Sequence, residues 1–321
     1  MKKLTALILA TIMLLSMTAC GGDSAAADDG KYTIGICQLV THDALDAATK
    51  GFQDAVIAGL GEENVVFDLQ NAAGDSNTCS SIANAFVAAN VDLIMANATP
   101  ALVAASTATA DIPILGTSVT EYGVALGLEN FSGTVGGNVS GTSDLAPLDQ
   151  QAAMLQEWFP DAKNVGLLYC SAEANSKYQV DTVKALLEGK GYTCERFAFA
   201  DSNDMAAVTE AACGFADVIY VPTDNAVASG TDVIDGICQP AGIPIIAGEE
   251  GICAGCGVAT LSISYYDLGY ATGEMAVQIL KGEADISTMP VGYAKNFTPK
   301  YNAEMCETLD LTPPEGYKAI G

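Results

Sequence analysis

Positive charge is scarce in this sequence. Lysine and arginine together number 13, against 39 aspartates and glutamates, and the formal net charge is −26. Because nucleic-acid binding depends on cationic contacts to phosphate, this balance argues against a nucleic-acid partner. Arg196 is the only arginine, and a bidentate grip on phosphate or carboxylate groups needs a guanidinium. A polyanionic ligand is therefore disfavoured, whereas a zwitterionic or neutral ligand remains possible.

Histidine and tryptophan each occur once, as His42 and Trp158. A zinc site needs about four ligands, and the lone Cys253-Ala-Gly-Cys256 motif has no second pair nearby, so we expect no metal and no cofactor. A catalytic site is also disfavoured, because there is no Gly-x-Ser-x-Gly motif and Glu249 and Glu250 would point to opposite faces of an extended chain. Trp158 is expected to pack in a helix.

Long apolar runs are absent after the N-terminus. Lys2 and Lys3 precede a short apolar stretch over residues 4–15, which is typical of a secretory signal and too short for a comfortable membrane span. Ala19-Cys20-Gly21 is similar to a bacterial lipobox, although Met17 stands where leucine is usual. We expect a signal peptide over 1–20, lipidation of Cys20, a flexible tether over 21–30 and anchoring at the outer face of the cytoplasmic membrane; ordinary signal cleavage is the alternative.

Nine further cysteines follow Cys20, an odd number that does not suggest a disulfide framework. Most of them stand beside apolar residues, as Cys37 and Cys170 do, so we expect small buried hydrophobic side chains. For Cys253 and Cys256, a disulfide and free thiols both remain open.

Strand-like and helix-like patterns alternate from residue 32 onward. Strands are expected at 32–39, 64–69, 91–96, 112–115, 164–169, 193–199, 218–221, 243–247 and 258–264. Helices are expected at 44–60, 76–89, from 99, 149–159, 175–190, 202–214, from 224 and 265–281. The glycine-rich residues 132–144 are interpreted as the passage between two lobes, with Asp144 as an N-cap of the next helix. The fold class is therefore α/β, with two similar doubly wound parallel-sheet lobes.

Several motifs, in order, carry a resemblance to a known family. The first is Asn138-Val-Ser-Gly-Thr-Ser-Asp144. The others are Gly35–Gln38 with His42–Leu45, Asn97–Pro100, Ile112–Ile114 with Thr117–Thr120, Ser171–Ser176, Val221–Asn225 and Leu268–Gly273. From about residue 31 to its end, the chain resembles a family of ABC-transporter substrate-binding lipoproteins with the type I periplasmic-binding-protein fold. Some members of this family bind tryptophan or related aromatic amino acids.

This resemblance implies a three-crossing hinge between the lobes. The first lobe would comprise residues 31–143 plus 266–290, and the second residues 144–265 plus 291–321. The implied function is that of a lipid-anchored, monomeric solute receptor that delivers a small ligand, most simply an aromatic amino acid, to an ABC permease. A sugar or nucleoside receptor of the same fold and a sensor ectodomain are the alternatives.

Ligands of such folds bind at the carboxyl ends of strands, in the crevice between lobes. The candidate contacts are Gln38, His42, Asn97, Thr99, Thr117, Ser118, Thr120, Ser143, Asp144, Ser171, Glu173, Asp224, Asn225, Glu249 and Tyr265. Some of these residues have simpler interpretations: Asp144 and Asp224 as helix caps, His42 and Asn97 as local hydrogen-bonding residues, and Glu249 as a solvated side chain.

Roles can be assigned by charge. A ligand ammonium would need a carboxylate, for which Asp224 is the first choice and Glu173 the second. A ligand carboxylate would lie on hydroxyls and amides near helix N-termini, at Thr99, Thr117 and Ser118. An aromatic side chain would need an apolar slot, for which the candidates are Leu39, Leu45 and Tyr265, with Tyr122 and Tyr266 as stacking partners.

Overall fold

The computed structural model describes residues 30–321. The predicted signal peptide, Cys20 and nearly all of the predicted tether lie outside these residues. Within them, no helix combines the length and apolar character that crossing a bilayer requires.

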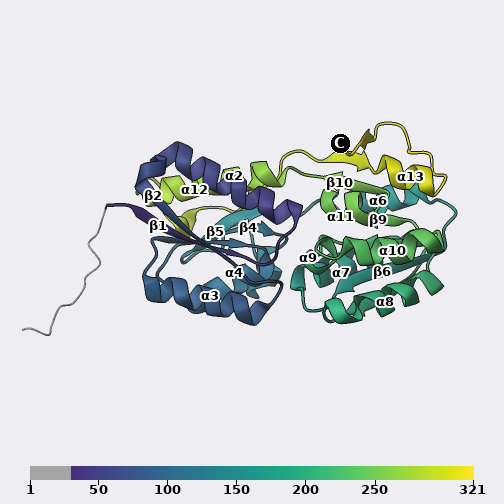
Figure 1. The fold of residues 1–321 in the computed structure, drawn as a ribbon, viewed down its shortest axis with the longest axis horizontal. Helices are drawn as coiled ribbons and strands as arrows, with labels where there is room; N and C mark the ends of the chain where they lie inside the picture. Colours follow the sequence, from purple (N-terminus) through teal and green to yellow (C-terminus); the bar gives the residue numbers. More distant parts are fainter. Residues whose placement is uncertain (1–29) are drawn as a thin grey trace, which may run out of the picture. The chain divides into compact units, whose positions relative to one another are not determined.

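The first lobe is built on a six-stranded sheet with the order β11-β5-β4-β3-β1-β2. Strands β1, β2, β4 and β5 of this sheet are labelled in Figure 1. All of its paired strands are parallel. The strands are β1 Tyr32–Gln38, β2 Val65–Asn71, β3 Leu93–Asn97, β4 Ile114–Val119, β5 Val139–Ser143 and β11 Gly292–Tyr293. The helices are α2 Asp43–Leu60, η1 Glu62–Asn64, α3 Ser76–Ala89, α4 Thr99–Ala108, α5 Tyr122–Leu126, α12 Tyr265–Leu280 and η2 Ile286–Thr288.

The second lobe has a seven-stranded sheet with the order β13-β12-β10-β9-β8-β6-β7. Its strands are β6 Asn164–Cys170, β7 Thr193–Phe199, β8 Val218–Val221, β9 Ile245–Ala247, β10 Ala259–Ser262, β12 Thr298–Tyr301 and β13 Lys318–Ala319. Its helices are α6 Leu148–Trp158, α7 Ala174–Gly189, α8 Ser202–Phe215, α9 Asn225–Ala228, α10 Thr231–Ala241, α11 Glu250–Cys256 and α13 Ala303–Thr308. The predicted pair of parallel-sheet lobes is confirmed, except that β12 runs antiparallel to β10.

Alternating side chains bury both faces of the first sheet. Ile34 and Ile36 of β1 pack with Phe52 of α2, whereas Cys37, on the opposite face, packs with Phe86 of α3. Successive strand residues point to opposite faces, so a continuous apolar run is what a sheet covered on both sides requires. Helices α2 and α12 lie on one face, and α3 and α4 on the other (Figure 1).

Glycines allow α12 to pack directly on α2. A Cβ atom at Gly269 would lie 1.9 Å from the carbonyl oxygen of Ala48, and one at Gly51 would lie 2.1 Å from that of Tyr266. No side chain fits at such distances, so the two backbones touch. Helix α12 follows the second passage between the lobes, and this contact fixes it to the first lobe.

The structure corrects the interpretation of residues 138–144. Most of this segment is the buried strand β5 rather than a loop passage. Gly141 has φ 142°, and a Cβ atom there would lie 2.0 Å from the Gly116 carbonyl oxygen. A glycine is therefore required at this position for β5 to lie against β4. Asp144 is not a helix N-cap either, because Pro147 holds that position for α6.

Within residues 30–321, the chain passes between the lobes three times, at residues 144–147, 263–264 and 294–297. The predicted boundary gave residues 291–321 to the second lobe, but β11 pairs with β5 at the edge of the first sheet. The third passage therefore begins after Tyr293. The helix predicted to begin at residue 224 is two helices, α9 and α10, with Gly230 between them. Helix α11 was not predicted, because it contains two glycines, which rarely favour a helix interior.

Candidate binding cleft between the lobes

Strand ends bring the predicted residues of the first lobe together. Gln38 is paired with Asn97, and Asn97 with Thr117, at the carboxyl ends of three adjacent parallel strands. In the second lobe, strands β6, β8 and β9 lead into helices α7, α9 and α11. The N-caps of these helices are Glu173, Asp224 and Glu249.

Side chains from both lobes enclose a cavity of about 10 Å³. Its lining is His42, Leu45, Ser118, Asp144, Thr223, Asp224, Asn225, Ala228, Glu249 and Tyr265. A second cavity of about 300 Å³ shares Asn225 with the first and is also lined by Leu39, Val40, Pro100, Ala172 and Glu173. The first cavity holds about one water molecule, whereas the second reaches the lower end of the usual range for ligand sites.

Four buried carboxyl groups line these two cavities. Asp144, Glu173, Asp224 and Glu249 are between 1% and 5% exposed, and none of them belongs to an ion pair within residues 30–321. Burial raises the pKa of Asp144 to about 6 and the pKa values of Glu173 and Glu249 to about 7, and it also raises that of Asp224. A desolvated carboxylate without a cation is costly, so a cationic group entering here would be stabilised.

In three of these carboxyl groups, both oxygens accept hydrogen bonds from the protein. Asp224 accepts bonds from the backbone N–H groups of Cys170 at 2.7 Å and Val227 at 2.9 Å. Glu173 accepts from Asn225 and from the N–H of Ala226. Glu249 caps α11 through the N–H groups of Gly251 and Ile252; the interpretation of Glu249 as a solvated side chain is therefore wrong.

Asp144 differs from the other three carboxyl groups. Its Oδ2 accepts a bond of 3.0 Å from the Tyr265 hydroxyl, while its Oδ1 is buried without a hydrogen-bond partner. The Thr120 and Tyr265 hydroxyls lower the pKa of Asp144 but do not overcome the effect of burial. A buried acceptor without a partner costs about 1–3 kcal/mol, so a donor that reaches Oδ1 from the cavity would be stabilised.

Two hydroxyls of the first lobe also lack partners. Ser118 Oγ is buried in the cavity lining without a hydrogen bond, and its backbone has φ 54°. Thr99 Oγ1 is likewise buried and unpaired at the first residue of α4. The N-terminal end of a helix favours negative charge, so this region suits a ligand carboxylate.

His42 joins the two lobes. Its Nε2 lies 3.3 Å from Asn225 Oδ1, and because an amide oxygen only accepts, the imidazole donates. Burial lowers the pKa of His42 although Asn225, Asp46 and Asp43 raise it. The imidazole is therefore neutral at pH 7.

The remaining predicted residues line neither cavity and support the strand ends. Gln38 accepts from the Thr49 hydroxyl and donates to Asp46, and Asn97 donates to Thr49 and to the Leu45 carbonyl oxygen. The Thr117 hydroxyl is hydrogen-bonded to the Thr142 hydroxyl. The Ser143 and Ser171 hydroxyls donate to the carbonyl oxygens of Thr120 and Phe199, respectively.

The two tyrosines proposed for stacking do not reach the cavities. Tyr122 is 1% exposed in the first-lobe core, where its hydroxyl donates to Gly116 and Thr142. Tyr266 is at the surface and donates to Asp54. Thr223 and Ala228, which sequence reasoning did not select, line the smaller cavity. Thr223 stands within the motif Val221–Asn225, which could have indicated it.

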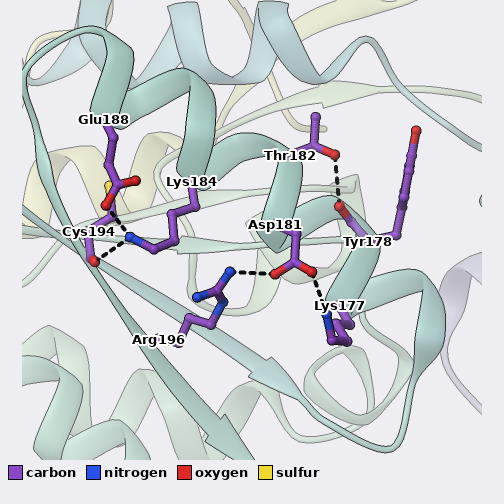
Figure 2. Close-up of polar contacts among 8 residues, drawn as sticks. All are labelled: Lys177, Tyr178, Asp181, Thr182, Lys184, Glu188, Cys194 and Arg196. Atoms are coloured by element: carbon purple, nitrogen blue, oxygen red, sulfur yellow. Dashed lines mark hydrogen bonds and ion pairs between the residues drawn. The ribbon is translucent and has the colours of Figure 1, made fainter.

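The single arginine is engaged away from both cavities. Figure 2 shows Arg196 of β7 paired with Asp181 of α7 at 2.6 Å, beside the Lys177–Asp181 pair. On the same helix, Lys184 contacts Glu188 and the Cys194 carbonyl oxygen. None of these residues lines either cavity, so the guanidinium plays no part in gripping an anion there.

The sequence model of the ABC transporter substrate binding protein family matches residues 33–318. The chain belongs to this family. Its members bind solutes, so the chain is a substrate-binding protein rather than an enzyme, and the predicted type I periplasmic-binding-protein fold is confirmed.

Three proteins are similar to this chain: one sequence relative and two solved structures. A tyrosine-binding protein of Clostridioides difficile is 37% identical, covering 97% of this chain and 93% of that protein. The Streptococcus pneumonia ABC domain in complex with L-Trp is 34% identical, with a TM-score of 0.85. The match covers 90% of this chain and 100% of that domain. The ligand-free, open structure of a substrate-binding protein with adhesive properties from Clostridium difficile is 39% identical with a TM-score of 0.68, covering 90% and 99%.

Proposed function

We propose that this chain captures an aromatic L-amino acid between its lobes and delivers it to an ABC importer. Family membership and relatives that bind tyrosine or L-Trp support the class of ligand. The single observation that carries the proposal is the unpaired Oδ1 of Asp144, in a cavity lined by buried carboxyl groups without a cation. An ammonium group is the cation that an amino acid supplies.

The proposal assigns the ammonium to Asp144 rather than to Asp224, the first choice from the sequence. Both oxygens of Asp224 accept bonds from the protein, whereas Asp144 retains a free acceptor. Glu249 lies in the same cavity wall and adds negative charge. The ligand carboxylate would lie near Ser118 and Thr99, and the ring would extend into the larger cavity, beside Leu39 and Pro100.

Binding requires the lobes to open and close. A cavity of about 10 Å³ cannot admit an amino acid, so the ligand must enter a wider conformation. In structure, the chain is more similar to the L-Trp complex, with a TM-score of 0.85, than to the open structure, with a TM-score of 0.68. In sequence, the open structure is the more similar of the two, at 39% against 34% identity. This difference supports a closed arrangement, with hinge motion at the three passages between the lobes.

The proposed setting is the outer face of the cytoplasmic membrane, where lipidated Cys20 and residues 21–30 would tether a monomeric receptor near its permease. The motif Ala19-Cys20-Gly21 supports this anchor, and the family acts outside the cytoplasm. Metabolic labelling with a clickable fatty acid tests it. The label should appear in the wild type and be absent from Cys20→Ala; equal labelling of both would exclude the anchor.

A thermal-shift screen tests the ligand class. The twenty amino acids, nucleosides and common sugars are added to the purified protein, and a ligand at one hundred times its Kd adds about 2.7 kcal/mol of stability. We expect tyrosine, tryptophan or phenylalanine to raise the melting temperature. A shift with only a sugar or a nucleoside would keep the receptor function and reject the amino acid.

A further inference from the structure

Two cysteine side chains of the second lobe face each other. Cys213 of α8 and Cys238 of α10 have their Sγ atoms 3.4 Å apart, although the residues are 25 positions apart in the sequence. A disulfide bond is about 2.05 Å long, so the two sulfur atoms must approach by about 1.4 Å. Side-chain rotation can provide a movement of this size.

The pair also has access to solvent. Cys213 is partly exposed, whereas the other eight cysteines within residues 30–321 are buried. Cys37 and Cys79 form another interacting pair, but each is 0% exposed. An oxidant can therefore reach Cys213 and, through it, Cys238, whereas the Cys37–Cys79 pair offers no accessible sulfur.

We propose that Cys213 and Cys238 are a modification site that forms a reversible disulfide by exchange with a small-molecule or protein disulfide outside the cytoplasm. The Cys213 thiolate attacks one sulfur of the oxidant and expels its first thiolate. The Cys238 thiolate then attacks Cys213 Sγ and expels the second. The two cysteine protons pass to the two leaving thiolates, so the oxidant disulfide is reduced to two thiols while the protein dithiol is oxidised.

Local electrostatics make this exchange slow at neutral pH. Burial raises the pKa of Cys213, with Glu210 adding to the shift and the Cys238 hydrogen bond opposing it. Burial also raises the pKa of Cys238, with further contributions from Cys213, Cys256 and Asp235. Because the thiolate is the reacting form, oxidation should become faster as the pH rises, and the dithiol should persist until an oxidant is supplied.

The disulfide would tie α8 to α10, which packs against α9 and α11. Those two short helices begin beside Asp224 and Glu249. Closing a loop of this size in the unfolded chain should raise the melting temperature by about 5–10 °C. Neither sulfur lines the binding cavities, so ligand affinity should remain within about twofold.

Peptide mapping tests the site on the full chain. Reduced protein is exposed to glutathione disulfide, its free thiols are alkylated, and it is digested without reduction. We expect the Cys213 and Cys238 peptides to be linked in the wild type and in Cys79→Ser, the control from the buried pair, and unlinked in Cys213→Ser and Cys238→Ser. The increase in melting temperature should appear only in the first two proteins and should reverse with a reductant.

Two results would overturn the proposal. One is recovery of Cys213 solely as its glutathione adduct or as free thiol, with Cys238 alkylated. The other is formation of the Cys37–Cys79 link in preference to the Cys213–Cys238 link, which would show that exposure does not select the site.

Discussion

His42 Nε2 donates a hydrogen bond of 3.3 Å to Asn225 Oδ1, and this bond joins the start of α2 in the first lobe to α9 in the second. Both residues line the smaller cavity. The bond exists only when the lobes are close together, so it stabilises the closed form selectively.

Replacing His42 by alanine should therefore weaken ligand binding through faster dissociation. A net hydrogen bond contributes about 0.5–1.5 kcal/mol, which corresponds to a loss of about 2–10-fold. Stopped-flow fluorescence would measure the two rate constants. Thr41→Ala, a neighbouring change outside both cavities, is the control; equal dissociation rates for His42→Ala and the control would contradict this role.

Asp224→Ala should destabilise the second lobe. The substitution leaves the N–H groups of Cys170 and Val227 without their acceptor and removes the cap of α9. We expect a loss of about 2–4 kcal/mol in the free energy of unfolding, measured by urea denaturation. Asp144→Ala, which removes contacts with the Tyr265 and Thr120 hydroxyls but removes no helix cap, should lose less. The reverse order would mean that Asp224 is not the structural carboxylate.

The buried carboxyl groups predict opposite pH dependences for stability and binding. The pKa of Asp144 is raised to about 6 from an ordinary value of 3.8, so the folded chain takes up a proton while the unfolded chain remains ionised. The contribution of Asp144 to stability is fully present below pH 3.8 and is lost as the pH rises through about 6. Ligand-free protein should gain about 2–3 kcal/mol from this group as the pH falls from 8 to 4.

Affinity for an amino acid should fall over the same acidic range, because protonated Asp144 no longer attracts an ammonium. The pKa of His42 is lowered, so protonation of His42 below pH 6.5 reduces stability, opposite to the effect of Asp144. The contribution of Asp144 is therefore measured as the difference between wild type and Asp144→Asn. Urea denaturation and calorimetric titration at several pH values measure the two quantities. If stability and affinity change with pH in the same way in both proteins, Asp144 contributes to neither effect.

Gly269→Ala should disrupt the packing of α12 on α2. The added Cβ atom would lie 1.9 Å from the Ala48 carbonyl oxygen, and overpacking of this kind typically costs about 1–3 kcal/mol or more. Gly236→Ala in α10 is the matched control, because no atom lies within 4 Å of its added Cβ and alanine favours a helix. Thermal unfolding should show a lower melting temperature for the first variant and an equal or higher one for the control.

Periodicity predicted the strands that carry the cleft, since apolar strands such as β3 and β8 are buried on both faces. It missed β5, because a segment with three hydroxyl residues and Gly141 has few strand signals, and its burial depends on contacts with Gly116 that only the fold creates. Trp158 packs against Tyr317 at the edge of the second-lobe core, as predicted.

The hydrogen-bond partners of the carboxyl groups in the site were harder to predict than the strands. The sequence placed Asp144, Asp224 and Glu249 near the cleft, but it could not show which carboxyl oxygens are occupied by backbone N–H groups. That depends on the neighbouring strand: Asp224 accepts from the backbone N–H of Cys170, 54 residues away, whereas Asp144 contacts the side-chain hydroxyls of Tyr265 and Thr120. The difference decides which carboxylate is available to a ligand.

Calorimetric titration with an aromatic amino acid and its analogue lacking the ammonium group, on wild type and Asp144→Asn, tests the central claim most directly. If Asp144 pairs with the ammonium in a desolvated cavity, wild type should prefer the amino acid by about 30-fold or more, corresponding to 2 kcal/mol or above. Asp144→Asn should lose most of that preference while binding the analogue as wild type does. An equally strong preference in both proteins would contradict the account and place the ammonium elsewhere.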